Sequence, residues 1–151
     1  MNGSRRDYWI GRLEFVNRRE RATTQAIDQA KRTGLEAPTD QVEAGAVSTS
    51  HLEEASDLAA SRTVLFLFVE FEAAVREAAN SLLVDIESAN ISQTVESVGI
   101  LADTSPPLLT AITTIRRSRN AILHERAQTD VPAEAAHRTL TQFLRSLPDW
   151  T

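Results

Sequence analysis

One basic segment, Ile115 to Gln128, holds the residues of this sequence that are best suited to chemistry. It reads IRRSRNAILHERAQ and carries four arginines and one histidine in a chain whose net charge is −5. Asn120 directly follows Arg119, and His124 lies four residues after Asn120. Arginine binds phosphate oxygens through a planar fork of donors, and an imidazole gains or loses its proton near neutral pH. The combination indicates a site for a phosphate ester; the alternative is a solvated helix face that is merely basic.

Helical spacing divides this segment into three parts. The core-facing line of the predicted helix contains Arg119 among apolar residues at steps of three and four, namely Leu108, Ile112, Ile115 and Ile122. A neighbouring stripe carries Arg116, Asn120 and His124. Arg117 and Arg126 fall elsewhere and are expected at the surface. On an ideal helix Arg119 and His124 point about 140° apart, so they converge only through a kink, a long arginine reach or a second subunit.

An arginine on an apolar line is expected to meet a carboxylate. The long helix predicted from about His51 to Ser88 offers Glu72, whose stripe is otherwise largely apolar and comprises Leu65, Val69, Arg76, Ala79 and Leu83. A carboxylate in such surroundings needs a partner, so Glu72 is the first candidate and Glu70 the second. Either the pair only fixes the register of the helices, or it orients Arg119 beside His124 toward a phosphate.

The remaining sequence predicts an all-α, single-domain, up-down bundle of four to five helices. Apolar residues recur with helical spacing, and glycine and proline gather between the predicted helices. These cover about 5–33, 51–88, 91–103, 107–126 and 133–147. Residues 1–33 are expected to form an amphipathic helix or arm, 34–49 a linker, and 50–151 the bundle. The basic face of the first helix is either solvated or a contact for RNA or a partner.

Composition excludes several classes of protein. Without cysteine there is no disulfide, thiol catalysis or thiolate metal site, and the three scattered histidines show no metal-ligand spacing. The start MNGSRRDYW lacks the apolar core of a secretory signal, and the run VLFLFV is too short to span a membrane. A cytoplasmic protein without a cofactor is therefore expected. The net charges of 1–33, 34–104 and 105–151 are +4, −11 and +2, so a local basic patch remains available for a polyanion.

The sequence Arg119-Asn120-Ala121-Ile122-Leu123-His124 resembles the R-N-x-x-x-H form of the R-x(4–6)-H motif of HEPN domains. The setting is similar to that family as well, because the motif follows an apolar run in the second half of a small helical bundle and is preceded by the glutamate-bearing helix FVEFEAAVREAA. The resemblance covers residues 50 to 147 and leaves 1–49 without a counterpart.

The resemblance implies a metal-independent endoribonuclease that acts as a homodimer, with two motifs facing each other in one composite site. Such proteins serve as toxins beside a cognate antitoxin, or in phage defence. The substrate's 2′-hydroxyl would be the nucleophile, giving a 2′,3′-cyclic phosphate and a 5′-hydroxyl. His124 would be the base, Arg119 would brace the phosphate, Asn120 would set the imidazole tautomer or bind the phosphate, and Arg116 and Arg117 would hold flanking RNA. Other members have lost catalysis, so the alternative is an inactive module that binds a protein or nucleotide.

Overall fold

The computed structural model describes residues 4–36, 49–84, 89–125 and 128–150, and within them every regular element is a helix. The helices are α1 (Arg5–Glu36), α2 (Thr49–Ser81), α3 (Ile91–Leu101), α4 (Pro106–Glu125) and α5 (Ala133–Ser146). The predicted all-α bundle is therefore confirmed. None of the described helices combines the length and the apolarity needed to cross a bilayer.

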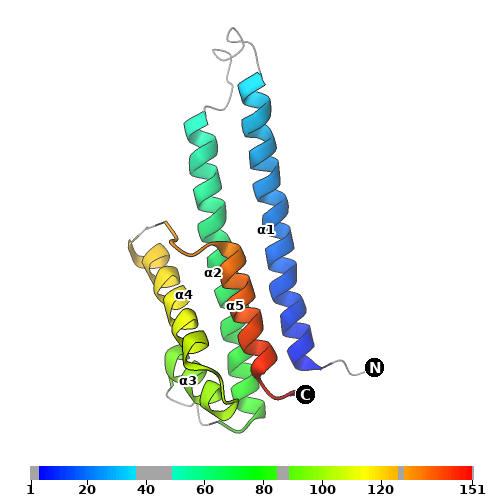
Figure 1. Ribbon diagram of the computed structural model, residues 1–151, viewed down its shortest axis with the longest axis vertical. Coiled ribbons are helices and arrows are strands. Elements are labelled where there is room, and N and C mark those ends of the chain that lie inside the picture. The colour runs from blue at the N-terminus through cyan, green and yellow to red at the C-terminus, as the bar shows by residue number, and fades with distance from the viewer. Residues whose placement is uncertain (1–3, 37–48, 85–88, 126–127, 151) are drawn as a thin grey trace.

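The two long helices α1 and α2 lie side by side and form the frame of the molecule (Figure 1). The shorter α5 packs against both of them, while α3 and α4 pack against α2 and each other. At one end of the bundle α1 and α2 extend beyond the other three helices (Figure 1). The region around α4 is thus a second layer on a two-helix frame.

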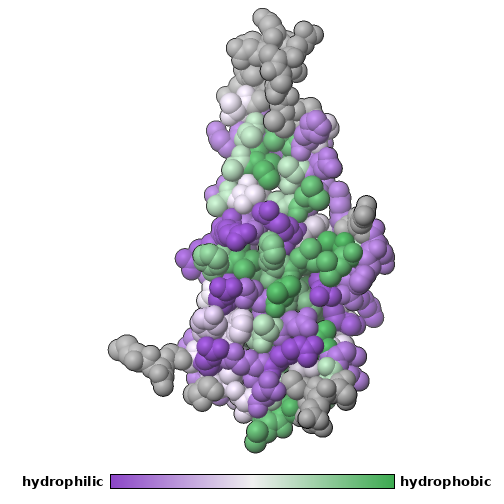
Figure 2. Space-filling model, turned by 180° about the vertical axis from the view of Figure 1, so that it is seen from behind, coloured by the Kyte–Doolittle hydropathy of each residue, from purple (hydrophilic) through white to green (hydrophobic). Residues whose placement is uncertain are grey.

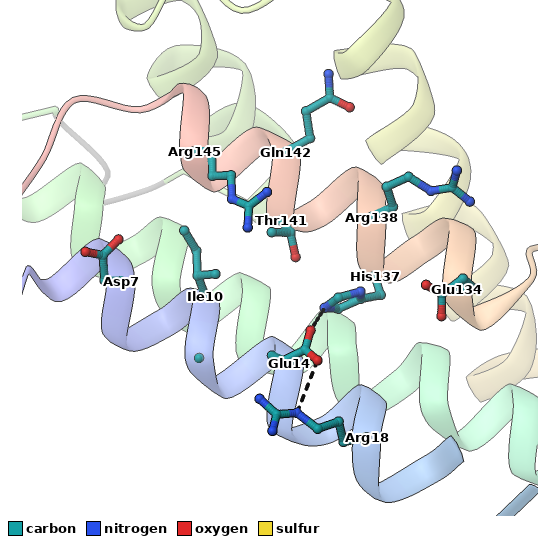
Figure 3. Close-up of a pocket in the computed structure, with 11 residues that line it drawn as sticks. Asp7, Ile10, Glu14, Arg18, Glu134, His137, Arg138, Thr141, Gln142 and Arg145 are labelled. Carbon is teal, nitrogen blue, oxygen red and sulfur yellow. Dashed lines mark hydrogen bonds and ion pairs between the residues drawn. The ribbon is translucent and has the colours of Figure 1, made fainter. Parts of the chain in front are cut away.

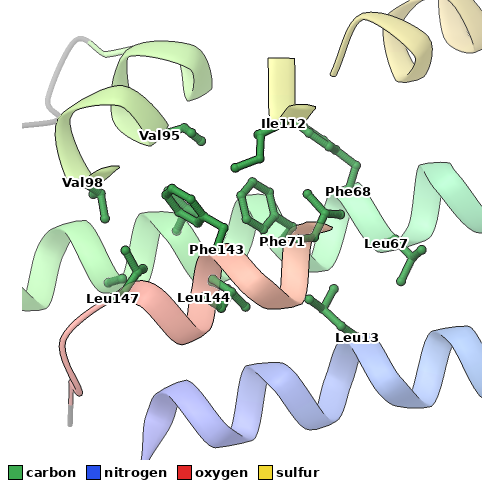
Figure 4. Packing of buried hydrophobic residues seen from close by; sticks show 14 of the residues in the cluster. Leu13, Leu67, Phe68, Phe71, Val95, Val98, Ile112, Phe143, Leu144 and Leu147 are labelled. Carbon is green, nitrogen blue, oxygen red and sulfur yellow. The ribbon is translucent and has the colours of Figure 1, made fainter. Parts of the chain in front are cut away.

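Aromatic and aliphatic side chains from all five helices fill a single core (Figure 4). Phe71 of α2 and Phe143 of α5 lie at its centre, fully buried and edge to face, with ring centroids 5.5 Å apart. Leu13 of α1 is also fully buried in this core, although the sequence offered residues 1–33 only as a helix or arm. The first helix is therefore packed as part of the bundle.

The predicted core line of α4 is buried at Ile112 and Ile115, whereas the stripe of α2 that contains Glu72 is not buried throughout. Apolar residues of α5 and of its C-cap are also buried, at Ala136, Leu140, Phe143 and Leu147. In α2, by contrast, Val69 is 55% exposed and Leu83 lies beyond the helix at 92%. The buried face is instead that of Val64, Leu67, Phe68, Phe71, Val75 and Ala78. Because this run is apolar on most sides, its periodicity does not define which side packs, and the neighbouring helices decide it.

The ends of the helices follow local signals. Asn90 caps α3 through a capping box with Gln93, in which each side chain bonds the other residue's backbone amide. Pro106 opens α4, as expected for proline in a first turn. Of the predicted linker, residues 34–36 belong to α1, Thr49 begins α2, and 37–48 lie outside the described residues.

Candidate functional site

Helix α4 turns one apolar face to the core and carries Arg119 on that same face. Ile112 and Ile115 are buried, and Arg119 follows them at the predicted step. Its guanidinium carbon lies 5.8 Å from the centroid of the Phe68 ring, within the range of a cation–π contact. Its Nη1 donates to Asn120 Oδ1 at 2.9 Å, whereas its Nε is buried and has no hydrogen-bond partner.

The two carboxylates predicted to pair with Arg119 have other partners. Glu72 accepts hydrogen bonds from Arg76 one turn later, with Nη2 to Oε1 at 3.1 Å. Glu70 is bound by the guanidinium of Arg12 from α1. Glu72 does not reach Arg119 because it lies beside the buried face of α2 rather than on it, and its side chain is 28% exposed. Within the described part of the chain, Arg119 is in contact with no carboxylate.

The neighbouring arginines of α4 share this property. Arg116 is half-buried and its Nε is also buried without a hydrogen-bond partner, while Arg117 is exposed. Neither forms an ion pair with any residue that the structure describes. Three guanidinium groups within four residues thus have no ion-pair partner among the residues that the structure describes. Arg126, the fourth arginine of the segment, lies outside the described residues.

His124 is exposed in the last turn of α4, and Asn120 is half-buried one turn earlier. The helix is continuous from Pro106 to Glu125, so the five-residue separation directs Arg119 and His124 to different sides. Arg119 reaches inward over Phe68, whereas His124 faces solvent. Within one chain the structure therefore brings Arg119 to Asn120 but does not bring it to His124.

His137, for which no role is predicted, lies in a groove of about 830 Å³ between α1 and α5 (Figure 3). Its Nε2 is 3.2 Å from Glu14 Oε2, and its side chain is only 12% exposed. Burial lowers the pKa of His137, against the opposing effect of Glu14 and Glu134. Thr141 lines the same groove with a buried hydroxyl that has no partner. An isolated histidine in the sequence carries no signal for such a groove, because the opposite wall comes from α1.

The arginines of α1 are arranged differently from those of α4. Each of the six from Arg5 to Arg21 has a carboxylate oxygen within 4.0 Å; the partners are Glu77, Asp7 and Asp149, Glu70, Glu14, Glu20, and Glu134. Several of these pairs join helices, such as Arg5 to Glu77 at 2.6 Å. The hydrogen bond from Arg5 is the main reason that the pKa of Glu77 is lowered. The basic face predicted for the first helix is thus largely neutralised by the fold.

No three of the described His, Asp and Glu residues gather where they could hold a metal ion. Comparison of the chain with protein-family models, with curated proteins and with solved structures returned no match. A function must therefore be inferred from the residues themselves, and those of α4 have the chemistry best suited to a site.

Proposed function

We propose that this chain is a metal-independent endoribonuclease of the HEPN type whose site is built on α4. One observation carries the proposal: Arg116, Arg117 and Arg119 have no carboxylate partner among the described residues, and they directly precede Asn120 and His124. A partly buried cation without a counter-ion is unfavourable. A phosphate of RNA supplies that counter-ion with the geometry that guanidinium prefers.

The residues divide the work of cleavage among them. His124 accepts the proton of the 2′-hydroxyl as its oxygen attacks phosphorus, the bond from phosphorus to the 5′-oxygen breaks, and the protonated imidazole returns a proton to that leaving oxygen. The products are a 2′,3′-cyclic phosphate and a 5′-hydroxyl. Arg119 stabilises the charge that develops on the phosphorane. Asn120, already bonded to Arg119, fixes the guanidinium or binds the phosphate, and Arg116 and Arg117 hold flanking phosphates.

A second copy of the chain completes the site in this proposal. Arg119 and His124 of one chain point apart, so one phosphate is served by Arg119 of one copy and His124 of the other. A homodimer with facing α4 helices meets this requirement without a kink in α4. The corresponding biological role is that of a toxin with a cognate antitoxin, or of a phage-defence effector, acting on RNA in the cytoplasm.

The test is RNA cleavage by the purified chain in the presence of EDTA, with the products resolved by end-group analysis. We expect cyclic-phosphate ends, and a loss of roughly 10²-fold or more in rate for His124→Ala. Arg138→Ala is the matched control, since Arg138 is an exposed arginine of α5 and should leave the rate unchanged. Undiminished cleavage by His124→Ala would refute the assignment of the base.

A non-catalytic HEPN-like module that binds a protein partner or nucleotide is the second candidate. It is favoured by the inward position of Arg119 over Phe68 and by the separation of Arg119 from His124 within one chain. The two candidates differ on expression in cells. Growth arrest that His124→Ala relieves supports the nuclease, whereas harmless expression with stable complex formation supports the binding module.

A further inference from the structure

A groove follows the seam between α1 and α2, on the side of that seam that α5 does not cover. Two hollows of about 220 and 290 Å³ succeed one another along it, and no residue of α5 lines either. A third hollow on the same two helices is lined by Ala133 and Glu134 of α5 and so lies on the covered side. The groove thus belongs to the face opposite α5.

The lining residues of this groove repeat with helical spacing on both helices. On α1 they include Phe15, Arg19, Thr23 and Ile27, and on α2 they include Leu58, Arg62 and Phe66. Steps of four residues keep each set on one side of its helix. The twelve residue steps from Phe15 to Ile27 span about 18 Å at 1.5 Å per step, which is the length of three to four turns of a docked helix.

Large apolar side chains in the groove are open to solvent. Phe15, Leu58 and Phe66 are 58%, 62% and 41% exposed, and Val69, one turn after Phe66, is also exposed. Figure 2 shows the face opposite to that of Figure 1, where hydrophobic surface gathers in the middle of the molecule between hydrophilic side chains. Apolar surface rimmed by polar groups is typical of a place where a partner binds.

Along the groove the positive charges are exposed, whereas the negative charges that pair with them are covered. The side chains of Arg12, Arg19 and Arg62 are 44%, 60% and 47% exposed, whereas those of their partners Glu20 and Glu70 are covered, at 3% and 18%. Arg19 also lies 5.9 Å from the ring centroid of Phe66. An approaching molecule therefore meets apolar side chains flanked by positive charge, with the carboxylates beneath.

We propose that this groove binds an acidic amphipathic helix of a partner protein, which would lie as a third helix along α1 and α2. Apolar residues spaced by three and four would contact Phe15, Leu58 and Phe66, and carboxylates beside them would meet Arg12, Arg19 and Arg62. A second copy of this chain fits less well, because two such rims would oppose arginine to arginine. RNA fits less well too, because much of the floor is aliphatic and offers few rings on which bases could stack.

The probe is a synthetic fluorescent 18-residue helix with leucine at positions spaced by three and four and glutamate at the flanking positions, measured by anisotropy. We expect saturable binding that weakens at least tenfold in Phe66→Ser and in Phe15→Ser. Leu101→Ser is the matched control, because Leu101 is an equally exposed apolar residue on α3. Thermal melting of each variant verifies the fold, and the cleavage rate proposed for α4 should be unchanged by Phe66→Ser.

Several outcomes would overturn the proposal. Absence of binding up to about 1 mM peptide, or equal binding of a peptide with lysine in place of glutamate, contradicts the complementarity of charge. A dimer in sedimentation that Phe66→Ser dissociates identifies a second copy as the occupant. An RNA oligonucleotide whose binding depends on Phe66 identifies nucleic acid instead.

Discussion

The arginines of α1 and those of α4 have the same chemistry but opposite surroundings. From Arg5 to Arg21 every arginine has a carboxylate close by, and the partners of several lie on α2 or α5. Arg116, Arg117 and Arg119 have none among the described residues, and two of them have a buried Nε without a partner. The first set is paired within the described part of the chain, whereas the second is where we propose that a phosphate binds.

This difference shows why net charge along a sequence is a weak guide to a binding surface. Residues 1–33 carry net +4 and residues 105–151 only +2, which would rank the first helix as the better site for RNA. The acidic residues that neutralise α1 lie largely in distant parts of the chain, such as Glu70, Glu77 and Glu134. Whether an arginine lacks a carboxylate partner depends on the tertiary structure, so the net charge of a segment does not locate a cationic site.

The largest effect that separates the two helices is expected for RNA cleavage. Arg119→Ala should lower the rate by about 10²–10³-fold, because it removes a donor to the charge on the phosphorane. Arg21→Ala, which breaks the pair with Glu134 on α5, should leave the rate unchanged and affect only stability. Initial rates on one RNA substrate give both values. Equal losses of cleavage rate in the two variants would show that the arginines of α4 are no more important for cleavage than those of α1.

The second largest effect concerns the packing of α1. Leu13→Ala should lower the free energy of unfolding by about 2–5 kcal/mol, because the side chain is fully buried in the shared core. Phe15→Ala, two residues later and 58% exposed, serves as the control and should change stability little. Chemical denaturation monitored by circular dichroism measures both. A small effect of Leu13→Ala would mean that α1 is held by its arginine pairs alone, as a detachable arm.

The sequence predicts the helices better than it predicts which side chains pair. The order of the helices and the buried lines of α4 and α5 follow from periodicity, because one side of each is clearly apolar. The face of α2 does not, since VLFLFV and its surroundings are apolar nearly all round, and the packing of α1 and α5 selects the side that contains Phe68 and Phe71. An error in the face of one helix changes every partner assigned across it.

The candidate site shows the same limit. Arg119 on a core-facing line was visible in the sequence, and the structure places it there over Phe68. The absence of a carboxylate partner for Arg119 could not be predicted, because it depends on other pairs. Glu72 pairs with Arg76 of its own helix, and Glu70 pairs with Arg12 of α1. His137 and its groove were missed for a related reason, since α1 supplies Glu14 across the seam.

A smaller effect is expected in the salt dependence of RNA binding. Measured in the His124→Ala background to prevent cleavage, Arg116→Gln or Arg117→Gln should each reduce the slope of log K against log salt by about 0.7, the value for one lost phosphate contact on a single strand. Arg18→Gln, which removes an exposed pair with Glu14, should leave the slope unaltered. Filter binding at several salt concentrations provides the slopes. A slope that responds to Arg18 instead would relocate the RNA surface to α1.

The smallest effect is expected in the pH dependence of stability, through His137 between α1 and α5. Burial lowers the pKa of His137, which faces Glu14 and Arg21 of α1 and Glu134 and Arg145 of α5. The unfolded chain therefore binds a proton at His137 more readily than the folded chain does. The free energy of unfolding is accordingly unaffected by His137 above pH about 6.5 and decreases as the pH falls below that value. The pKa of Glu134 and that of Glu77 are lowered by hydrogen bonds from Arg21 and Arg5, so the stability that these two carboxylates contribute is lost only near pH 4.5 and below. Melting curves between pH 7.5 and about 5 should thus show a modest decrease in Tm that His137→Gln removes, whereas an unchanged decrease in this variant would place the titrating group elsewhere.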